Sequence, residues 1–460
     1  MMNTTPNPPD ATVEPVDERL PLGTMLLYGL QHVLVMAAAP ITAAFLIGHT
    51  LELPDNVTVG LMSAIFLACG LAGILQSVGV SGFGARLPFV QVPGGAPLVI
   101  FLAIAQATDL QTATGAVILT GLFYFLALPF FTRVLRFFPP IVIGTMLLLV
   151  AVNLIRIFGG LITGRPGSPE FAAMGNIGLA LVTIACTVIF ARCFTGMWQR
   201  IAVMLGLLAG AAVAVASGAM SFSGVLEGPI VAFPQPFPFG MPKFDLFASL
   251  PLIIFSVVSM TEATGQTLAT AEIVERKGDH KAIVPRNIRA DALGSLFGGC
   301  FGTSLIITSG ENIGIIRATG VRSRYVTIAA GAMLVLLALC APLGRLAYAI
   351  PTAVVAGTAV IVFAIIGVMG INILRRVDFN QNGNMFTLAA ALAMGLIPIV
   401  VPGFYSAFPQ HLQIVLGNGL AMGTLTAVLV NILFYHLGHS RTPAPATKQV
   451  DLAGEHIKSK

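Results

Sequence analysis

Residues 309–320 read SGENIGIIRATG and place a carboxylate, Glu311, deep in a chain that is 56% hydrophobic and 9% charged. An ionisable side chain at the centre of a membrane helix costs roughly 2.5–3.5 kcal/mol, so it faces a cavity or a partner. The apolar run beside Glu311 is too short to cross about 30 Å of hydrocarbon. The Ser/Thr/Gly-rich sequence before it interrupts a helix. The stretch therefore predicts a half-helix that begins within a membrane.

The rest of the chain also has the composition of an integral membrane protein. Its charged fraction of 9% is far below the roughly 25% of soluble domains. Hydropathy predicts an all-α membrane protein of about fourteen transmembrane segments, of which the third and the tenth are short and broken. The expected spans are 22–47, 58–79, 93–107, 114–132, 140–158, 174–191, 200–219, 244–271, 288–304, 312–320, 325–347, 350–373, 384–402 and 413–437.

The positive charges predict the orientation of these spans. The odd-numbered loops hold only Arg156, Arg165, Lys243 and Arg345. The even-numbered loops hold Arg86, Arg133, Arg136, Arg192, Arg200, Arg276, Lys277, Lys281, Arg286, Arg289, Arg317, Arg322, Arg324, Arg375 and Arg376. Because cytoplasmic loops are enriched in Lys and Arg, both termini are expected to lie in the cytoplasm. The protein itself is expected in the inner membrane of the cell. This asymmetry accounts for the net charge of +5 without nucleic acid as a partner.

The chain is expected to form one transmembrane domain over residues 21–438, between cytoplasmic tails 1–20 and 439–460. The first tail is acidic, which argues against a cleaved signal peptide. The two halves of the chain are weakly similar in sequence, since an Asn-x-x-Arg ends a span at residues 153–156 and again at 372–375. Seven spans per half require inverted repeats, and paired broken spans in such repeats point to a binding site at the membrane midplane.

Two polar side chains in the eighth span are candidates for this site. Glu262 and Gln266 are four residues apart and share one helical face. A carboxylate and an amide together suit a flat ligand that carries N–H and C=O groups along its edge. The alternative, which stays open for both residues, is a hydrogen bond between helices.

The broken tenth span supplies the second group of candidates. Glu311 and Asn312 follow Gly310 at the expected start of a half-helix, where unpaired backbone N–H groups can stabilise an anion or donate to a ligand oxygen. The alternative is that Glu311 only caps this helix. Two carboxylates at one low-dielectric cavity favour a proton on one of them, which is a plausible basis for proton symport.

Three further polar residues are candidates for proton coupling or structural support. His32 lies in the middle of the first span, where a buried, hydrogen-bonded structural role is expected. Asp291 opens the ninth span close to a basic loop, so a salt bridge or helix cap competes with a coupling role. Thr264 lies between Glu262 and Gln266. No His/Cys spacing of a metal site is present, and no cofactor is expected.

Three motifs in order resemble those of the nucleobase–ascorbate transporter family, the xanthine/uracil permeases. They are Gln31-His32, Glu262-Ala-Thr-Gly265, and Glu311-Asn-x-Gly followed by Thr319-Gly320. The resemblance implies a core of spans 1–4 and 8–11, a gate of spans 5–7 and 12–14, and short strands at the third and tenth spans. It also implies that Glu262 binds a nucleobase, that Glu311 and nearby backbone complete the site, that protons drive transport, and that the protein is a homodimer.

The motifs contain features of both xanthine and uracil permeases. Residues 319–326, TGVRSRYV, look like bacterial xanthine permeases, whereas Glu311 is typical of uracil permeases and purine members carry Gln there. Purine members also carry Asp where Gln266 stands, and Gly95 occupies the position of the family's base-stacking aromatic. We therefore expect a purine, xanthine or urate, with uracil as the alternative.

Two other classes of protein fit the sequence less well. An anion exchanger of the related seven-plus-seven fold is the remote alternative, but two carboxylates would repel its anion. An enzyme is not expected, because the sequence contains no His-Glu-x-x-His or other catalytic motif.

Overall fold

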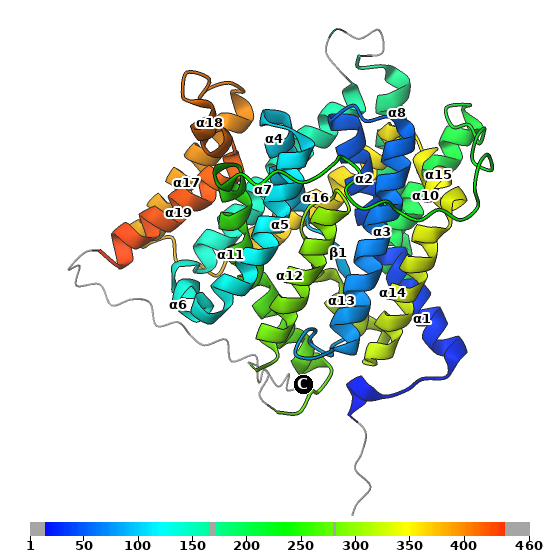
Figure 1. Ribbon diagram of the computed structural model, residues 1–460, viewed down its shortest axis with the longest axis horizontal. Helices are drawn as coiled ribbons and strands as arrows, with labels where there is room; N and C mark the ends of the chain where they lie inside the picture. Colours follow the sequence, from blue (N-terminus) through cyan, green and yellow to red (C-terminus); the bar gives the residue numbers. More distant parts are fainter. Residues whose placement is uncertain (1–13, 165–166, 168–170, 279–281, 438–460) are drawn as a thin grey trace, which may run out of the picture.

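The computed structural model describes residues 14–164, 167, 171–278 and 282–437, without the side chains of Thr132, Val134, Leu135, Met197, Glu311, Ala318, Gln410 and His411. Nearly all of its regular structure is helical (Figure 1). The first half contains η1 (Pro15–Asp17), α1 (Leu22–Met36), α2 (Ala38–Thr50), α3 (Asp55–Val78), β1 (Gln91–Pro93), α4 (Gly95–Ala107), α5 (Leu110–Ala127), η2 (Leu128–Phe130), α6 (Phe131–Val134), η3 (Leu135–Phe137), α7 (Pro140–Thr163), α8 (Met174–Cys193), α9 (Met197–Arg200) and α10 (Ala202–Ala216). The second half contains α11 (Leu246–Ile273), α12 (Val284–Cys300), β2 (Ile306–Thr308), α13 (Glu311–Thr319), α14 (Arg324–Leu339), α15 (Ala341–Tyr348), α16 (Thr352–Leu374), α17 (Asn382–Val400), α18 (Gln410–Leu416) and α19 (Gly419–Tyr435).

Each predicted span coincides with a helix or a pair of helices. Among the described residues, eight helical stretches are long and apolar enough to cross a membrane, and four shorter apolar helices accompany them. Several predicted spans are divided in the structure, the first of them at Ala37 into α1 and α2. The eleventh divides at Cys340 into α14 and α15, where Pro342 starts a new helix, and the last divides into α18 and α19. The number of fourteen spans stays a prediction.

The two short strands lie where the third and tenth spans are broken. β1 and β2 pair antiparallel, with Gln91 opposite Thr308 and Pro93 opposite Ile306. Two backbone bonds extend this pairing: the N–H of Gly94 donates to the carbonyl of Leu305 at 3.1 Å, and the N–H of Ser309 donates to that of Val90 at 3.0 Å. An isolated two-stranded sheet is marginal in water, so the helices around it must hold it.

Small residues allow the most extensively packed helices to approach closely. α3 packs on α14, and α7 packs on α16. A β-carbon at Gly70 of α3 would lie 2.7 Å from the carbonyl oxygen of Gly331, and one at Gly144 of α7 would lie 3.0 Å from that of Gly370. Such close backbones are typical of membrane helix pairs.

The helices fall into two groups by packing. α7, α8, α10, α16, α17 and α19 contact mainly one another, as do α1–α5, α11, α12 and α14. In Figure 1, α17 and α19 lie at one end of the molecule, whereas α1 and α14 lie at the other. Packing alone does not test whether one group moves against the other, so the division into core and gate stays a prediction.

Candidate functional site

A cavity of about 130 Å³ lies where the strand pair meets the two helix groups. Its walls come from α2, from β1 and the start of α4, from α11, from β2 and the start of α13, and from α7 and α16. Three predicted site residues, Glu262, Gly95 and Gly310, line it. Among the lining residues whose side chains the structure describes, Glu262 alone carries an ionisable group.

Glu262 and Gln266 share one face of α11, as their spacing predicts. The Gln266 Nε2 donates to Glu262 Oε1 at 3.1 Å. The Gln266 amide oxygen is buried and accepts no hydrogen bond from the described residues. A β-carbon at Gly310 would lie 2.9 Å from Gln266 Nε2, so residue 310 has to be small. Gln266 therefore lies behind Glu262 and orients its carboxylate, although it does not itself line the cavity.

Both half-helices begin at this cavity. Gly94 precedes α4 and Gly310 precedes α13, and neither helix has a side-chain cap at its first residue. The first N–H groups of a helix lack intrahelical acceptors and carry a partial positive charge. Glu311 is the first residue of α13, as predicted, but its side chain lies outside the described part of the structure. The two helix starts offer donors for ligand oxygens.

Asp291 is the centre of a buried hydrogen-bond network behind the cavity. Its Oδ1 accepts from Gln76 Nε2 at 2.9 Å, Gln91 Nε2 at 3.0 Å and Thr308 Oγ1 at 2.8 Å. The expectation of a salt bridge or helix cap is wrong, because α12 begins seven residues earlier at Val284 and the donors are uncharged. The network joins α3, both strands and α12, and so fixes the strand pair in place.

The structure places three other candidates away from the cavity lining. Asn312 is fully buried, and its Nδ2 donates to the carbonyl oxygen of Pro88. His32 is 3% exposed and its side chain interacts with Asn312. Thr264 donates within α11 to the Met260 carbonyl at 2.8 Å. These contacts tie α13 to α1 and to the segment before β1.

Sequence reasoning missed four residues at or near this site. Gln76, Gln91 and Thr308 complete the Asp291 network, and Phe363 of α16 lines the cavity. Gln76 lies near the end of the second predicted span, as Gln266 lies near the end of the eighth, so the criterion that selected Gln266 would also have found it. Phe363 carries no such signal, because it is one apolar residue among many in its span.

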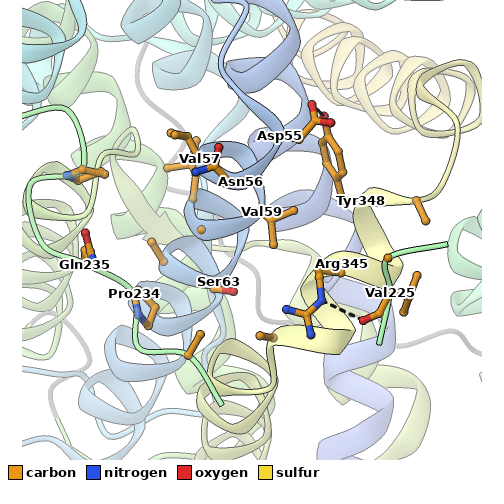
Figure 2. Close-up of a pocket in the computed structure, with 18 of the residues that line it drawn as sticks. Asp55, Asn56, Val57, Val59, Ser63, Val225, Pro234, Gln235, Arg345 and Tyr348 are labelled. Carbon is orange, nitrogen blue, oxygen red and sulfur yellow. Dashed lines mark hydrogen bonds between the residues drawn. The ribbon is translucent and has the colours of Figure 1, made fainter. Parts of the chain in front are cut away.

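A larger cavity of about 750 Å³ lies elsewhere, between α3, α15 and the segment before α11 (Figure 2). Its main polar groups are already bonded within the protein. Tyr348 Oη donates to Asp55 Oδ1 at 2.7 Å, and Arg345 Nε donates to the Val225 carbonyl at 2.9 Å. The first bond joins α15 to α3, and the second attaches the segment between α10 and α11 to α15. This cavity shares no lining residue with the one at Glu262.

Solved structures share the fold at low sequence identity. The transmembrane domain of the cyanobacterial bicarbonate transporter BicA aligns with a TM-score of 0.57 at 15% identity, covering 91% of this chain and 100% of that one. The murine anion transporter Slc26a9, inward-facing, aligns with a TM-score of 0.58 at 14% identity, covering 91% and 69%. These likenesses confirm the predicted fold class of inverted repeats.

Curated relatives align over nearly the whole chain. The uric acid permease PucJ of Bacillus subtilis is 30% identical over 410 residues, which cover 88% of this chain and 91% of that protein. The uric acid transporter UacT of Escherichia coli is 30% identical over 434 residues, covering 94% and 90%. A xanthine permease of Bacillus subtilis is 29% identical over 412 residues, covering 90% and 94%. A model described as a permease family matches residues 23–404. Together with the three motifs, this match shows that the chain belongs to the xanthine/uracil permease, or nucleobase–ascorbate transporter, family and is a transporter rather than an enzyme.

Proposed function

We propose that the protein imports a purine nucleobase, xanthine or urate, together with a proton. The observation that carries this proposal is the position of Glu262 in the cavity wall, close to the starts of α4 and α13. No other lining residue whose side chain the structure describes is ionisable. A carboxylate accepts from the N–H groups of a base, and helix starts donate to its carbonyl oxygens. The relatives that align over nearly the whole chain are uric acid and xanthine permeases, which favours a purine over uracil.

A third cavity, separate from the one in Figure 2, supports a path to this site. It has a volume of about 500 Å³, and its lining includes His49 of α2, Gln106 of α4 and Asn153 of α7. These residues lie one or two turns beyond Ala43, Leu98 and Val150, which line the cavity at Glu262. A polar path between the two helix groups suits transport by movement of the core against the gate.

Proton coupling is supported by a second carboxylate behind the first. Asp291 lies close enough to Glu262 for their charges to interact. Two negative charges in a poorly solvated site repel, and one proton on the pair relieves that repulsion. Binding of a base to Glu262 would then be linked to the protonation of the pair.

A cytoplasmic N-terminus is supported by an ion-pair cluster around Asp17. Asp17 lies 2.5 Å from Arg324, 3.1 Å from Arg276 and 3.8 Å from Arg86. The three arginines belong to three different even-numbered loops, for which the charge pattern predicts a cytoplasmic position. Burial alone would raise the pKa of Asp17, but the hydrogen bond from Arg324 and the charges of the three arginines outweigh burial and lower it. The homodimer stays a prediction from the family resemblance.

Uptake measurements test the function directly. The chain would be produced in a bacterial strain without purine permeases, and uptake of radiolabelled xanthine and urate would be followed with unlabelled xanthine, urate, guanine and uracil as competitors. We expect competition by purines and faster uptake at lower external pH. Competition by uracil alone would reassign the substrate to pyrimidines, and uptake that ignores both pH and a protonophore would contradict proton symport.

A further inference from the structure

Two aromatic side chains line the cavity at Glu262, Phe255 from α11, the helix of Glu262 itself, and Phe363 from α16. Phe363 lines the cavity and is 7% exposed. A β-carbon at Gly95, the first residue of α4, would lie 2.5 Å from Phe363 Cε1. Real β-carbons essentially never approach another heavy atom so closely. The ring therefore occupies the space that any side chain at position 95 would need.

The Phe363 ring is held in place before any ligand binds. It stacks on Phe158 of α7, with ring centroids 5.4 Å apart and an interplanar angle of 13°. Leu154 of α7 fills part of the same space, since a β-carbon at Gly95 would lie 3.3 Å from its Cδ1. The pair α7–α16 is among the most closely packed in the molecule. A ring fixed in this way loses little side-chain entropy when a ligand packs on it.

We propose that Phe363 is the aromatic residue against which the base packs, and that it determines specificity from the gate side of the cavity. This inference rests on the proposed function. Glu262 and the helix starts bind the polar edge of the base, whereas Phe363 contacts the face of its ring system. This contact favours a planar bicyclic base over a single ring, because the larger ring system buries more apolar area. Gly95 and Phe363 are complementary, because only one of the two positions can hold an aromatic ring.

The test compares Phe363→Leu with Phe101→Leu, a matched substitution of a fully buried phenylalanine in α4 outside the cavity lining. Leucine keeps apolar volume but removes the ring. We expect Phe363→Leu to raise the KM for xanthine or urate about tenfold, with little change in the maximal rate or the amount of protein in the membrane. Phe101→Leu should leave KM unchanged.

A second pair of variants relocates the ring. Gly95→Phe alone should lose transport because its side chain collides with Phe363, whereas Gly95→Phe combined with Phe363→Ala should recover a KM within a few-fold of the wild type. Ligand-induced stabilisation of the purified proteins against heat, measured with xanthine and urate, checks binding where uptake is low.

The outcomes separate this inference from the proposed function. If the wild type takes up no nucleobase, both are overturned. If the wild type transports a purine but Phe363→Leu keeps its KM, or loses affinity no more than Phe101→Leu, only the role of Phe363 is overturned. Failure of the double variant to bind better than Phe363→Ala would overturn the complementarity of positions 95 and 363.

Discussion

Replacing Glu262 with Gln is the most direct perturbation of the proposed site. Glu262 Oε1 accepts from Gln266, and Oε2 accepts no hydrogen bond from the described residues. Glutamine has nearly the same shape and can still bond to Gln266, so the fold should persist. What is lost is a charge-assisted hydrogen bond to the N–H of a base, worth about 1.5–3 kcal/mol. This corresponds to a loss of affinity of roughly 10–150-fold.

At substrate concentrations near the wild-type KM, uptake by Glu262→Gln should therefore fall to about 1–20% of the wild-type rate, while the amount of protein in the membrane stays the same. Initial rates of radiolabelled xanthine and urate uptake, normalised to protein quantified by immunoblot, provide the measurement. Thr264→Ser, which keeps the hydroxyl bond to Met260 on the same helix, is the control and should transport normally. Near-normal uptake by Glu262→Gln would refute the assignment of Glu262 to the base.

Four other substitutions test separate parts of the structure. Asp291→Leu removes the acceptor that Gln76, Gln91 and Thr308 share, although Gln76 and Thr308 keep Asn287 as an acceptor. It should destabilise the protein by about 1–3 kcal/mol, whereas Asp291→Asn should fold; equal thermal stability of the two would contradict the network. Asp17→Asn should cost about 1.5–3 kcal/mol at neutral pH. Because the folded-state pKa of Asp17 is lowered, its stabilisation is present above the ordinary carboxyl pKa and is lost as pH falls through the folded value, so the difference from the wild type in thermal unfolding should vanish in strong acid. Gly70→Leu should abolish folding, because the backbone carbonyl of Gly331 blocks its β-carbon. Gly175→Ala should be neutral, because a β-carbon there meets nothing within 4 Å. The size-exclusion profiles of the two variants in detergent show whether each is folded. Glu311→Gln should strengthen competition by xanthine relative to uracil, and an unchanged competition profile would restrict Glu311 to a capping role.

The sequence predicts those parts of the site that lie within one element. Helical spacing places Glu262 and Gln266 on one face, and the broken third and tenth spans predict where the strands and half-helices occur. The Asp291 network could not be predicted, since its donors come from α3, β1 and β2, and Gln91 lies more than two hundred positions from Thr308 along the chain. The spacing of residues in sequence carries no information about such contacts between distant segments.

The position of Phe363 illustrates a second limit. An apolar span offers many equivalent residues, and only the position of its ring beside Gly95, at the start of α4, selects Phe363 as part of the cavity wall. The missing aromatic at Gly95 was visible in the sequence, but its replacement from another helix was not. A polar residue in a membrane segment can be singled out from the sequence, because placing it there costs free energy and so requires a partner or a cavity. An apolar residue can be singled out only from the packing around it in the structure.

The walls of the cavity are divided between the two helix groups in a way that bears on transport. The carboxylate of Glu262 and the starts of α4 and α13 belong to one group, and Phe363 belongs to the other. If the first group moves against the second, a base carried with Glu262 leaves the ring of Phe363 behind. Affinity would then be highest where the base lies against α16 and would fall as the core moves away, which aids release on the far side.

A variant that carries the ring on α4 instead, Gly95→Phe with Phe363→Ala, keeps the aromatic contact throughout the movement. We therefore expect this double variant to bind xanthine or urate with a KM close to that of the wild type but to transport it more slowly, because release becomes the slow step. An unchanged maximal rate would show that the ring does not need to stay on α16.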